Sequence, residues 1–326
     1  MCGLAGSVDF PLHFESMRAA LQHRGPDEQT IWQTDNIHLF HARLSIVDKT
    51  GGVQPMHHRN RYTIVFNGEI YNHNELRKQH NLNGQTHSDT ETILLLYERF
   101  GADCLQQLDG MFVLVIYDQQ EKTLFIARDR AGKKPLYLYN DGQKILFASE
   151  LNALRSQLRL ELNKNNFYHY LRLGVFYREL TPFQHVTEMP AGSWMTINCQ
   201  NRRIQSHRWW NIHDFYAQPQ QLSFEEALTE TNIRLQQSVR RRLESSDLEV
   251  GAFLSGGIDS GLVTAIASNL HPKIKTFTVS FEGAYDEAPL AKLVAERYQT
   301  DHTEIRISFR NLQNDIEKIL CNYGEP

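Results

Sequence analysis

The chain opens with the residues MCGLAGSVDF (residues 1–10), and the remainder of the fold is expected to be arranged around them. The apolar residues from Leu4 to Phe10 predict a strand, which would hold Cys2 in place. Removal of Met1 would make Cys2 the terminal residue, so that one residue carries a thiol and a free α-amine. Because such amines and thiols titrate near pH ~8 and ~8.5, the amine can accept the thiol proton directly or through one water. The opening therefore predicts an N-terminal nucleophile, with an accident of the start site as the alternative.

The composition is that of a globular protein with two domains. Of the 326 residues, 41% are hydrophobic and 22% are charged. A net charge of -4 and a pI near 6.4 provide no basic surface for nucleic acid or anionic membranes. The longest apolar run, Met111 to Tyr117, is far shorter than the ~18 residues of a membrane helix. We therefore expect neither a nucleic-acid partner nor a membrane partner.

The cysteines are spread through the chain and contain no C-x-x-C pair, which argues against a disulfide framework or a zinc site. They are Cys2, Cys104, Cys199 and Cys321. The histidines form no H-E-x-x-H pattern, so they do not predict a metal centre. No signal peptide precedes Cys2, and we therefore expect a cytoplasmic protein whose cysteines are thiols.

Residues 1–211 are predicted to form mostly strands, packed as stacked sheets with helices against them. The expected helices are Phe14 to Leu21, Asn74 to Lys78, and Asp89 to Phe100, the last opened by a capping-box pattern from Ser88 to Glu91. Residues 191–220 are expected to be rich in loops, and residues 151–210 suggest no chemistry. The expected strands are Leu4 to Phe10, Ile37 to Val47, Tyr62 to Phe66, Met111 to Asp118, Thr123 to Arg128, Pro135 to Tyr139 and Ile145 to Ala148.

Strands and helices alternate in residues 212–326, which predicts a parallel sheet with right-handed crossovers. We therefore expect a second domain that begins near residue 212. Its expected helices are Phe224 to Leu243, Asp259 to Ser268, Ala288 to Tyr298 and a last one ending at Cys321. Its expected strands are Val250 to Leu254, Ile274 to Ser280 and Thr303 to Ile307.

The loop Ser255-Gly256-Gly257-Ile258-Asp259-Ser260 follows a predicted strand and opens a predicted helix. Backbone N–H groups at such a junction can hold phosphate, and the two serines add hydroxyl donors. Asp259 would repel a phosphate unless a Mg²⁺ ion lies between them. No Gly-Lys-Ser/Thr follows, so this is not a Walker loop. The loop predicts nucleotide binding, with a plain tight turn as the alternative.

The two halves together resemble the glutamine-hydrolysing asparagine synthetases. The resemblance rests on an ordered series that covers the chain: Cys2-Gly3, His23 to Asp27, Ala42 to Asp48, Asn67 to Asn72, His87 to Glu91, Arg128 to Tyr137 and Ser255 to Ser260. It implies a class II glutamine amidotransferase domain, folded as an N-terminal-nucleophile αββα sandwich. It further implies that an incomplete parallel α/β ATP-pyrophosphatase domain follows, with limits of 1–211 and 212–326.

For the first domain, the resemblance implies that Cys2 attacks the carboxamide of glutamine and releases ammonia. The side-chain amide of Asn67 and the backbone N–H of Gly68 would form the oxyanion hole. The alternative for Asn67 and Gly68 is a hairpin turn. Water would then hydrolyse the thioester that the attack leaves on Cys2.

The resemblance also implies how glutamine is held. Arg43 offers a planar fork for its α-carboxylate, and Asp89 would bind its α-ammonium group, assisted by Glu69. The alternatives are that Arg43 pairs with Asp48 and that Asp89 only caps a helix. The residues whose backbone groups would line the pocket are Ile46 and Val47.

For the second domain, the resemblance implies that ATP activates the side-chain carboxylate of aspartate as an acyl-adenylate. Ammonia delivered through an internal passage would then displace AMP to give asparagine. Backbone groups of Leu254 and Val279 would contact the adenosine. The residues that would hold pyrophosphate and Mg²⁺ are Ser255, Gly256, Gly257, Asp259 and Ser260, with Asp259 acting on the metal indirectly.

The sequence departs from the family at Pro326, because family members continue beyond this point with a second acidic phosphate loop. We expect the strand from Val250 to Leu254 to lie at an exposed sheet edge, and we expect the chain by itself to hydrolyse glutamine without making asparagine at a useful rate. A homodimer, or a second chain that supplies the rest of the sheet, is the expected partner. The alternatives are an amidotransferase acting on another carboxylate such as a sugar acid, and a non-catalytic remnant or partner subunit.

Overall fold

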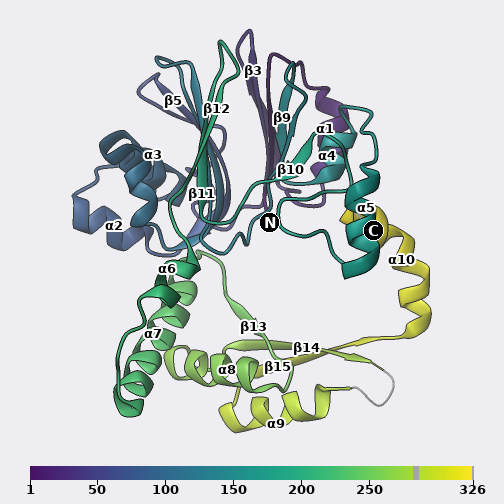
Figure 1. The fold of residues 1–326 in the computed structure, drawn as a ribbon. Coiled ribbons are helices and arrows are strands. Elements are labelled where there is room, and N and C mark those ends of the chain that lie inside the picture. The colour runs from purple at the N-terminus through teal and green to yellow at the C-terminus, as the bar shows by residue number, and fades with distance from the viewer. Residues whose placement is uncertain (282–285, 325–326) are drawn as a thin grey trace. The chain divides into compact units, whose positions relative to one another are not determined.

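The computed structural model describes residues 1–281 and 286–324. Its contacts divide the chain into two compact units, Met1–Gln218 and Pro219–Tyr323. Each unit has its own sheets and its own hydrophobic cores. The two units are therefore described one after the other (Figure 1).

The first unit contains two six-stranded sheets with strand orders β10-β8-β9-β1-β3-β2 and β12-β11-β7-β6-β5-β4. Neighbouring strands in both sheets pair antiparallel. The strands are β1 (Gly3–Val8), β2 (Glu28–Gln33), β3 (Ile37–Arg43), β4 (Met56–His58), β5 (Tyr62–Ile70), β6 (Gly110–Asp118), β7 (Thr123–Arg128), β8 (Tyr137–Asn140), β9 (Ile145–Ala148), β10 (Val186–Glu188), β11 (Ser193–Asn198) and β12 (Ile204–Arg208).

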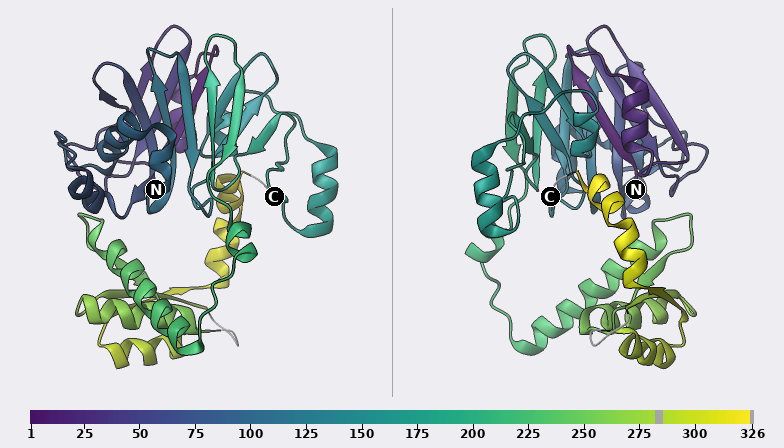
Figure 2. Two further views of the ribbon diagram at one scale, coloured as in Figure 1. Left: turned by 60° about the vertical axis from the view of Figure 1, so that its left-hand side comes forward. Right: turned by 90° about the vertical axis from the view of Figure 1, so that its right-hand side faces the viewer.

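The two sheets pack face to face, and helices cover their outer faces (Figures 1 and 2). The core between the sheets contains Leu4 and Leu39 from one sheet and Val65 and Val115 from the other. Separate cores lie beneath the helices on each outer side. The helices of this unit are α1 (Phe14–Leu21), α2 (His73–His80), α3 (Asp89–Phe100), the 3₁₀ helix η1 (Gly101–Gln106), α4 (Leu151–Arg155), α5 (Lys164–Leu173) and α6 (Ile212–Ala217). This arrangement confirms the expected αββα sandwich.

Some local expectations were wrong. Strand β5 continues to Ile70, so Asn67 and Gly68 lie within a strand and not in a hairpin turn. Residues 191–220 contain the paired strands β11 and β12 and the helix α6, where loops were expected. Strand β11 buries every second residue, but its polar neighbours in sequence hide that alternation.

The second unit has a parallel sheet with the order β13-β14-β15, and helices connect its strands. The strands are β13 (Gly251–Phe253), β14 (Lys275–Phe281) and β15 (Asp301–Ile307). The helices are α7 (Phe224–Glu244), α8 (Ile258–Leu270), α9 (Ala288–Tyr298) and α10 (Phe309–Tyr323). These elements confirm the expected alternation.

The start of helix α7 in the second unit follows from local chemistry. Helix α7 begins after Ser223, whose hydroxyl accepts from the N–H of Glu226, while the Glu226 carboxylate accepts from the N–H of Ser223. Strand β13 is an edge strand: in the part of the chain that the structure describes, it pairs with β14 alone. Within the same described part, no helix has the length and apolar character needed to cross a membrane.

Candidate active site

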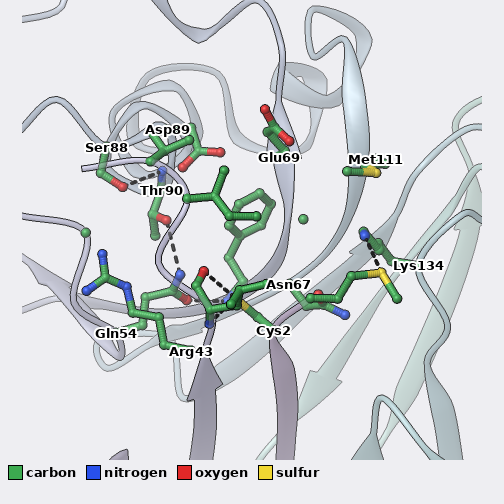
Figure 3. Close-up of a pocket in the computed structure, with 17 residues that line it drawn as sticks. Cys2, Arg43, Gln54, Asn67, Glu69, Ser88, Asp89, Thr90, Met111 and Lys134 are labelled. Atoms are coloured by element: carbon green, nitrogen blue, oxygen red, sulfur yellow. Dashed lines mark hydrogen bonds between the residues drawn. The ribbon is translucent and has the colours of Figure 1, made fainter. Parts of the chain in front are cut away.

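All the residues predicted for glutamine chemistry line one pocket of the first unit (Figure 3). Cys2 directly precedes β1, and the pairing of Gly3 with Ala42 brings the end of β3 beside it. The other residues come from the loop after β3, from β5 and from the start of α3. The predicted residues that line the pocket are Cys2, Arg43, Ile46, Val47, Asn67, Gly68, Glu69 and Asp89.

Cys2 is held at both its side chain and its backbone. Its Sγ atom lies 3.4 Å from the backbone nitrogen and 3.6 Å from the carbonyl oxygen of Leu44. Its own carbonyl accepts a 3.0 Å hydrogen bond from Nε of Arg24, which is in turn paired with Glu150 at 2.7 Å. Burial raises the pKa of the Cys2 thiol, so the thiol needs a base to become a nucleophile.

Asn67 has an unusual environment for a buried amide. Its side chain is 0% exposed, yet neither Oδ1 nor Nδ2 has a hydrogen-bond partner among the described residues. An unpaired polar atom in such a position costs about 1–3 kcal/mol. The amide is therefore a candidate for binding a group that enters the pocket, because a ligand would supply the missing partner.

The N–H of Gly68 points away from the neighbouring strand β6. Gly68 lies opposite Phe112 in the β5–β6 pair. Both backbone groups of Phe112 bond to Asp129: its N–H donates to Oδ2 at 3.0 Å, and its carbonyl accepts from the Asp129 N–H at 2.9 Å. The polar backbone groups of Phe112 thus point toward β7. Gly68 and Phe112 therefore form a non-hydrogen-bonded pair, and the backbone groups of Gly68 point away from β6.

The neighbours of Gly68 in β5 indicate what lies on this outer side. The N–H groups of Phe66 and Ile70 share its direction, since alternate residues of a strand do. Phe66 donates to Oε1 of Gln54 at 2.6 Å, and Ile70 donates to Oδ2 of Asp89 at 3.1 Å. Gln54 and Asp89 both line the pocket. The N–H of Gly68, between them, therefore faces the pocket, next to the residue that carries the unpaired amide.

Arg43 is buried, and its guanidinium is oriented by the loop that follows β3. Its terminal nitrogens donate to the carbonyl oxygens of Lys49 at 2.9 Å and Asp48 at 2.7 Å, and one of them lies 3.5 Å from the Glu28 carboxylate. The hydrogen bond to Asp48 is to its backbone and not to its carboxylate. A guanidinium has five N–H donors, so donors remain for a substrate carboxylate.

Asp89 begins α3 but is not its N-cap. Ser88 is the N-cap, and its hydroxyl accepts from the N–H of Thr90 at 3.2 Å. The Asp89 carboxylate also accepts from the N–H of Ile70 in β5 at 3.1 Å, which is a contact outside the helix. Asp89 is 4% exposed, and burial, reinforced by the charge of Glu69, raises the pKa of its carboxyl to about 6. A cation bound beside Asp89 would restore the ionised form.

Several pocket residues were not predicted from the sequence. Gln54 joins two walls of the pocket, because its Nε2 donates to Thr90 at 3.2 Å while its Oε1 accepts from β5. Nothing in the sequence around Gln54 marks it. Lys134 lies within the motif Arg128 to Tyr137, which was used for the resemblance without a role for this residue. The complete set of unpredicted side chains named in Figure 3 is Gln54, Ser88, Thr90, Met111 and Lys134.

The predicted phosphate loop joins β13 to α8 in the second unit. Gly256 has a φ of +75°, and a Cβ atom there would lie 2.7 Å from Cβ of Leu290. Gly257 is the N-cap of α8 and has no side-chain cap, so the first N–H groups of the helix are not capped. The hydroxyls of Ser255 and Ser260 lie 3.0 Å apart. These groups fit a bound phosphate.

The remaining residues predicted for the nucleotide surround this loop. Leu254 is buried, and both of its backbone groups are engaged: its N–H donates to Phe277 at 2.8 Å and its carbonyl accepts from the Thr278 hydroxyl. Val279 is partly exposed on β14, and Asp259 is exposed in the first turn of α8. Among residues 1–281 and 286–324, no cluster of three or more potential metal ligands occurs. A single carboxylate suits the indirect metal contact predicted for Asp259.

Two facing antiparallel sheets between helical layers, with the candidate nucleophile at the start of β1, define a class II glutamine amidotransferase. The family described as the glutamine amidotransferase domain matches residues 1–210, and the family described as asparagine synthase matches residues 230–326. The chain belongs to the family of glutamine-hydrolysing asparagine synthetases. Its membership of that family implies the use of ATP.

Individual relatives support this assignment along the entire chain. A putative asparagine synthetase 2 [glutamine-hydrolyzing] of Methanocaldococcus jannaschii is 32% identical and is matched over 100% of this chain and 68% of its own length. The asparagine synthetase 1 [glutamine-hydrolyzing] of Bacillus subtilis is 31% identical over 100% of this chain and 53% of its own length. The chain spans about half the length of several of the curated relatives that it matches. Among solved structures, a glutamine phosphoribosylpyrophosphate amidotransferase of B. subtilis has a TM-score of 0.47 and 18% identity, covering 93% of this chain and 65% of its own.

Proposed function

We propose that the pocket around Cys2 hydrolyses glutamine to glutamate and ammonia. The observation that carries the proposal is the unpaired, fully buried amide of Asn67 beside the Gly68 N–H, both at the pocket that Cys2 lines. Two donors that face the same pocket form a site for an oxygen that gains negative charge during a reaction. The carboxamide oxygen of glutamine becomes such an oxyanion when a thiolate attacks its carbon.

The proposed reaction has two stages that use the same groups. The α-amine of Cys2, freed by removal of Met1, takes the thiol proton, and Sγ attacks the carboxamide carbon. The proton passes to the nitrogen that leaves as ammonia, and a thioester remains. Water, activated by the same amine, then releases glutamate. Each oxyanion-hole donor is expected to contribute a factor of about 10²–10³ in kcat.

The charged residues of the pocket are proposed to hold the amino-acid end of glutamine. Arg43 would bind the α-carboxylate through its free donors, and Asp89 would bind the α-ammonium group with help from the charge of Glu69. Backbone groups of Ile46 and Val47 would line the same end. Because these contacts position the substrate and do not change during the reaction, they are expected to affect KM more than kcat.

The second unit is proposed to use the ammonia in an ATP-dependent amidation of aspartate. The relatives are named as glutamine-hydrolysing asparagine synthetases, which supports this proposal. Ser255, Gly256, Gly257 and Ser260 would hold the phosphates, and Asp259 would act on a Mg²⁺ ion through water. Leu254 and Val279 would contact the adenosine. When bound, ATP would supply the activation of the carboxylate. We further propose a cytoplasmic protein that works as a homodimer or with a second chain; the free state of all four cysteines suits that compartment.

The proposal is tested by measuring glutamate and asparagine separately. The purified chain is incubated with glutamine alone, and then with glutamine, aspartate, ATP and Mg²⁺. We expect glutamate in both reactions and none above background for Cys2→Ala. Failure of the unaltered chain to release glutamate, after mass spectrometry has shown that Met1 is removed, would refute the assignment of the pocket. Asparagine and AMP in the second reaction report on the amidation separately.

A further inference from the structure

Lys134 has a position that the proposed reaction does not explain. Its side chain is only 3% exposed, it lines the same pocket as Cys2, and its Nζ donates to Sδ of Met1 at 2.9 Å (Figure 3). A buried lysine is rare unless it is paired or has a function. The contact is to the side chain of the residue whose removal exposes the terminal amine, and both Lys134 and Cys2 line the pocket in which that amine is proposed to act.

The backbone around Lys134 is held by hydrogen bonds to two neighbouring side chains. Its N–H donates to Oδ2 of Asp129 at 3.2 Å, and its carbonyl accepts from Nε of Arg128 at 2.7 Å. Asp129 also accepts from the N–H of Lys133 at 3.0 Å. The turn that carries Lys134 is therefore fixed by side chains on both sides, and the direction of the lysine into the pocket is a property of the fold.

We propose that Lys134 is a positioning residue that acts on the α-amine of Cys2: its cation disfavours protonation of that amine and so keeps it available as the base. This inference rests on the proposed glutamine hydrolysis. An amine that already holds a proton cannot take one from the thiol. A second cation nearby raises the cost of that proton, by the same like-charge effect that activates some catalytic lysines.

The charges around the terminus agree with this role. In the structure the terminal amine is that of Met1, and its pKa is lowered, first by burial and then by the cations of Lys134 and Arg24. The Cys2 thiol and Asp27 act in the opposite direction. Removal of Met1 transfers the terminal amine to the nitrogen of Cys2, which lines the pocket with Lys134.

The pKa of Lys134 itself is lowered by its surroundings, with burial as the main cause. Burial and Arg24 lower the pKa of Lys134, whereas Cys2, Glu69 and Asp129 raise it. The thiol of Cys2 is also influenced by Asp89, which raises its pKa, and by Arg43, which lowers it. Lys134 is thus supported as a cation by acidic groups on β5 and on its own turn, although the burial opposes it.

The same cation helps the second proton transfer. After the thiol has given its proton to the amine, that proton must pass to the departing nitrogen of glutamine. An ammonium group with a lowered pKa gives up its proton more readily. Loss of the lysine charge should therefore slow the reaction most at low pH, where the amine of the variant would be protonated in the resting enzyme.

The test compares Lys134→Met, Lys134→Gln and Lys134→Arg with the matched control Lys133→Met, which removes a charge from the exposed neighbouring residue. For each chain, kcat at saturating glutamine is measured between pH 5.5 and 9.5. We expect the acidic limb of the profile to move upward by about one pH unit in Lys134→Met and Lys134→Gln. Lys134→Arg and Lys133→Met should retain the unaltered profile.

A purely structural lysine would give a different result. In that case the two neutral variants would lose the same factor of kcat at every pH, and the limb would not move; this outcome would overturn the inference. Thermal melting identifies which variants are folded. If one neutral variant fails to fold, the pH profile of the other neutral variant is compared with that of Lys134→Arg, and the movement of its acidic limb decides between the two roles. If every neutral variant fails to fold, Lys134 has a structural role and the inference is likewise overturned.

A second measurement does not depend on turnover. The rate at which an acylating reagent modifies the α-amine of Cys2 follows the fraction of neutral amine, and mass spectrometry of the N-terminal peptide reports it. We expect the titration of this rate to shift upward by about one pH unit in Lys134→Met, and an unchanged titration would reject the role of the lysine. If the unaltered chain releases no glutamate, the proposed function fails, but this titration still decides whether Lys134 acts on the amine.

Discussion

Two buried asparagines of the first unit differ in how their amides are used. Asn72 has a partner for each end of its amide: Nδ2 donates to the carbonyl of Gln107 at 2.9 Å, and Oδ1 accepts from the N–H of Asp109 at 2.9 Å. Asn67 has a partner for neither end in the described part of the chain. The first amide serves the stability of the fold, whereas the second costs stability and is explained only by what it binds.

Replacing Asn67 with Ala should therefore lower kcat for glutamine by about 10²–10³ without lowering the free energy of unfolding. Asn72→Ala is the matched control and should lose roughly 1–3 kcal/mol of stability. Chemical denaturation and glutamate release measure the two effects. The oxyanion role would be wrong if Asn67→Ala kept its kcat, or if it lost as much stability as Asn72→Ala.

Asp89 should make the binding of glutamine depend on pH. The pKa of its carboxyl is raised to about 6, so the free pocket loses this negative charge below that value. Because the substrate's ammonium group binds the ionised form, KM should rise by up to about tenfold for each pH unit below ~6. In Asp89→Asn, KM should be high at pH 8 and nearly independent of pH. A KM of the unaltered chain that stays constant from pH 8 to pH 5 would contradict this role.

At the scale of elements, the helices and strands that could be predicted from the sequence were those with a clearly apolar face. The long helices α3, α7 and α9 and the buried strands β6 and β7 agree closely with expectation, because a continuous apolar face marks them. Strand β2 was missed because its residues are polar and half-buried at a sheet edge. The extension of β5 through Asn67 and Gly68 was missed because these residues favour turns, and pairing with β6 overrides that preference.

The pocket was predicted unevenly for a related reason. Residues with a distinctive chemistry in a recognisable motif, such as Cys2 and Arg43, could be assigned from the sequence. Gln54 could not, because its role comes from the strand and the helix that its amide joins, β5 and α3, and these meet only in the folded chain.

The loop between β13 and α8 provides a prediction about its two adjacent glycines. Gly256→Ala places a Cβ at a φ of +75° and 2.7 Å from Leu290, whereas a Cβ at Gly257 has only the Ser255 hydroxyl within 4 Å, at 3.5 Å. We expect Gly256→Ala to destabilise the second unit by about 1–3 kcal/mol and to weaken MgATP binding. Gly257→Ala should be much less destabilising. Denaturation and nucleotide titration test this, and equal effects of both changes would disagree with the loop geometry.

At the scale of the whole molecule, each compact unit has its own core and its own candidate site. The eight residues proposed to bind or hydrolyse glutamine all lie within Met1–Gln218. The seven residues proposed to bind the nucleotide all lie within Pro219–Tyr323. A ligand stabilises the unit that binds it. The two sites should therefore be distinguishable by their effects on unfolding.

Calorimetry should show two unfolding transitions, of which MgATP raises only one. Gly256→Ala should abolish that shift, while the other transition and the release of glutamate in the absence of ATP remain as in the unaltered chain. Limited proteolysis with mass spectrometry assigns each transition to its unit. A single transition that MgATP moves as a whole would contradict the independence of the units.

The alternation along β5 has a consequence for sequence change. Phe66, Gly68 and Ile70 direct their N–H groups to the same side of β5 because they are alternate residues of the strand. A substitution in this strand alters one side chain, but a one-residue insertion or deletion between Phe66 and Ile70 would turn both backbone groups of Gly68 toward β6 and away from the pocket. The proposed glutamine hydrolysis therefore depends on the number of residues between Phe66 and Ile70 as strictly as on their types. Variants of this segment should tolerate substitutions at several positions but no one-residue insertion or deletion.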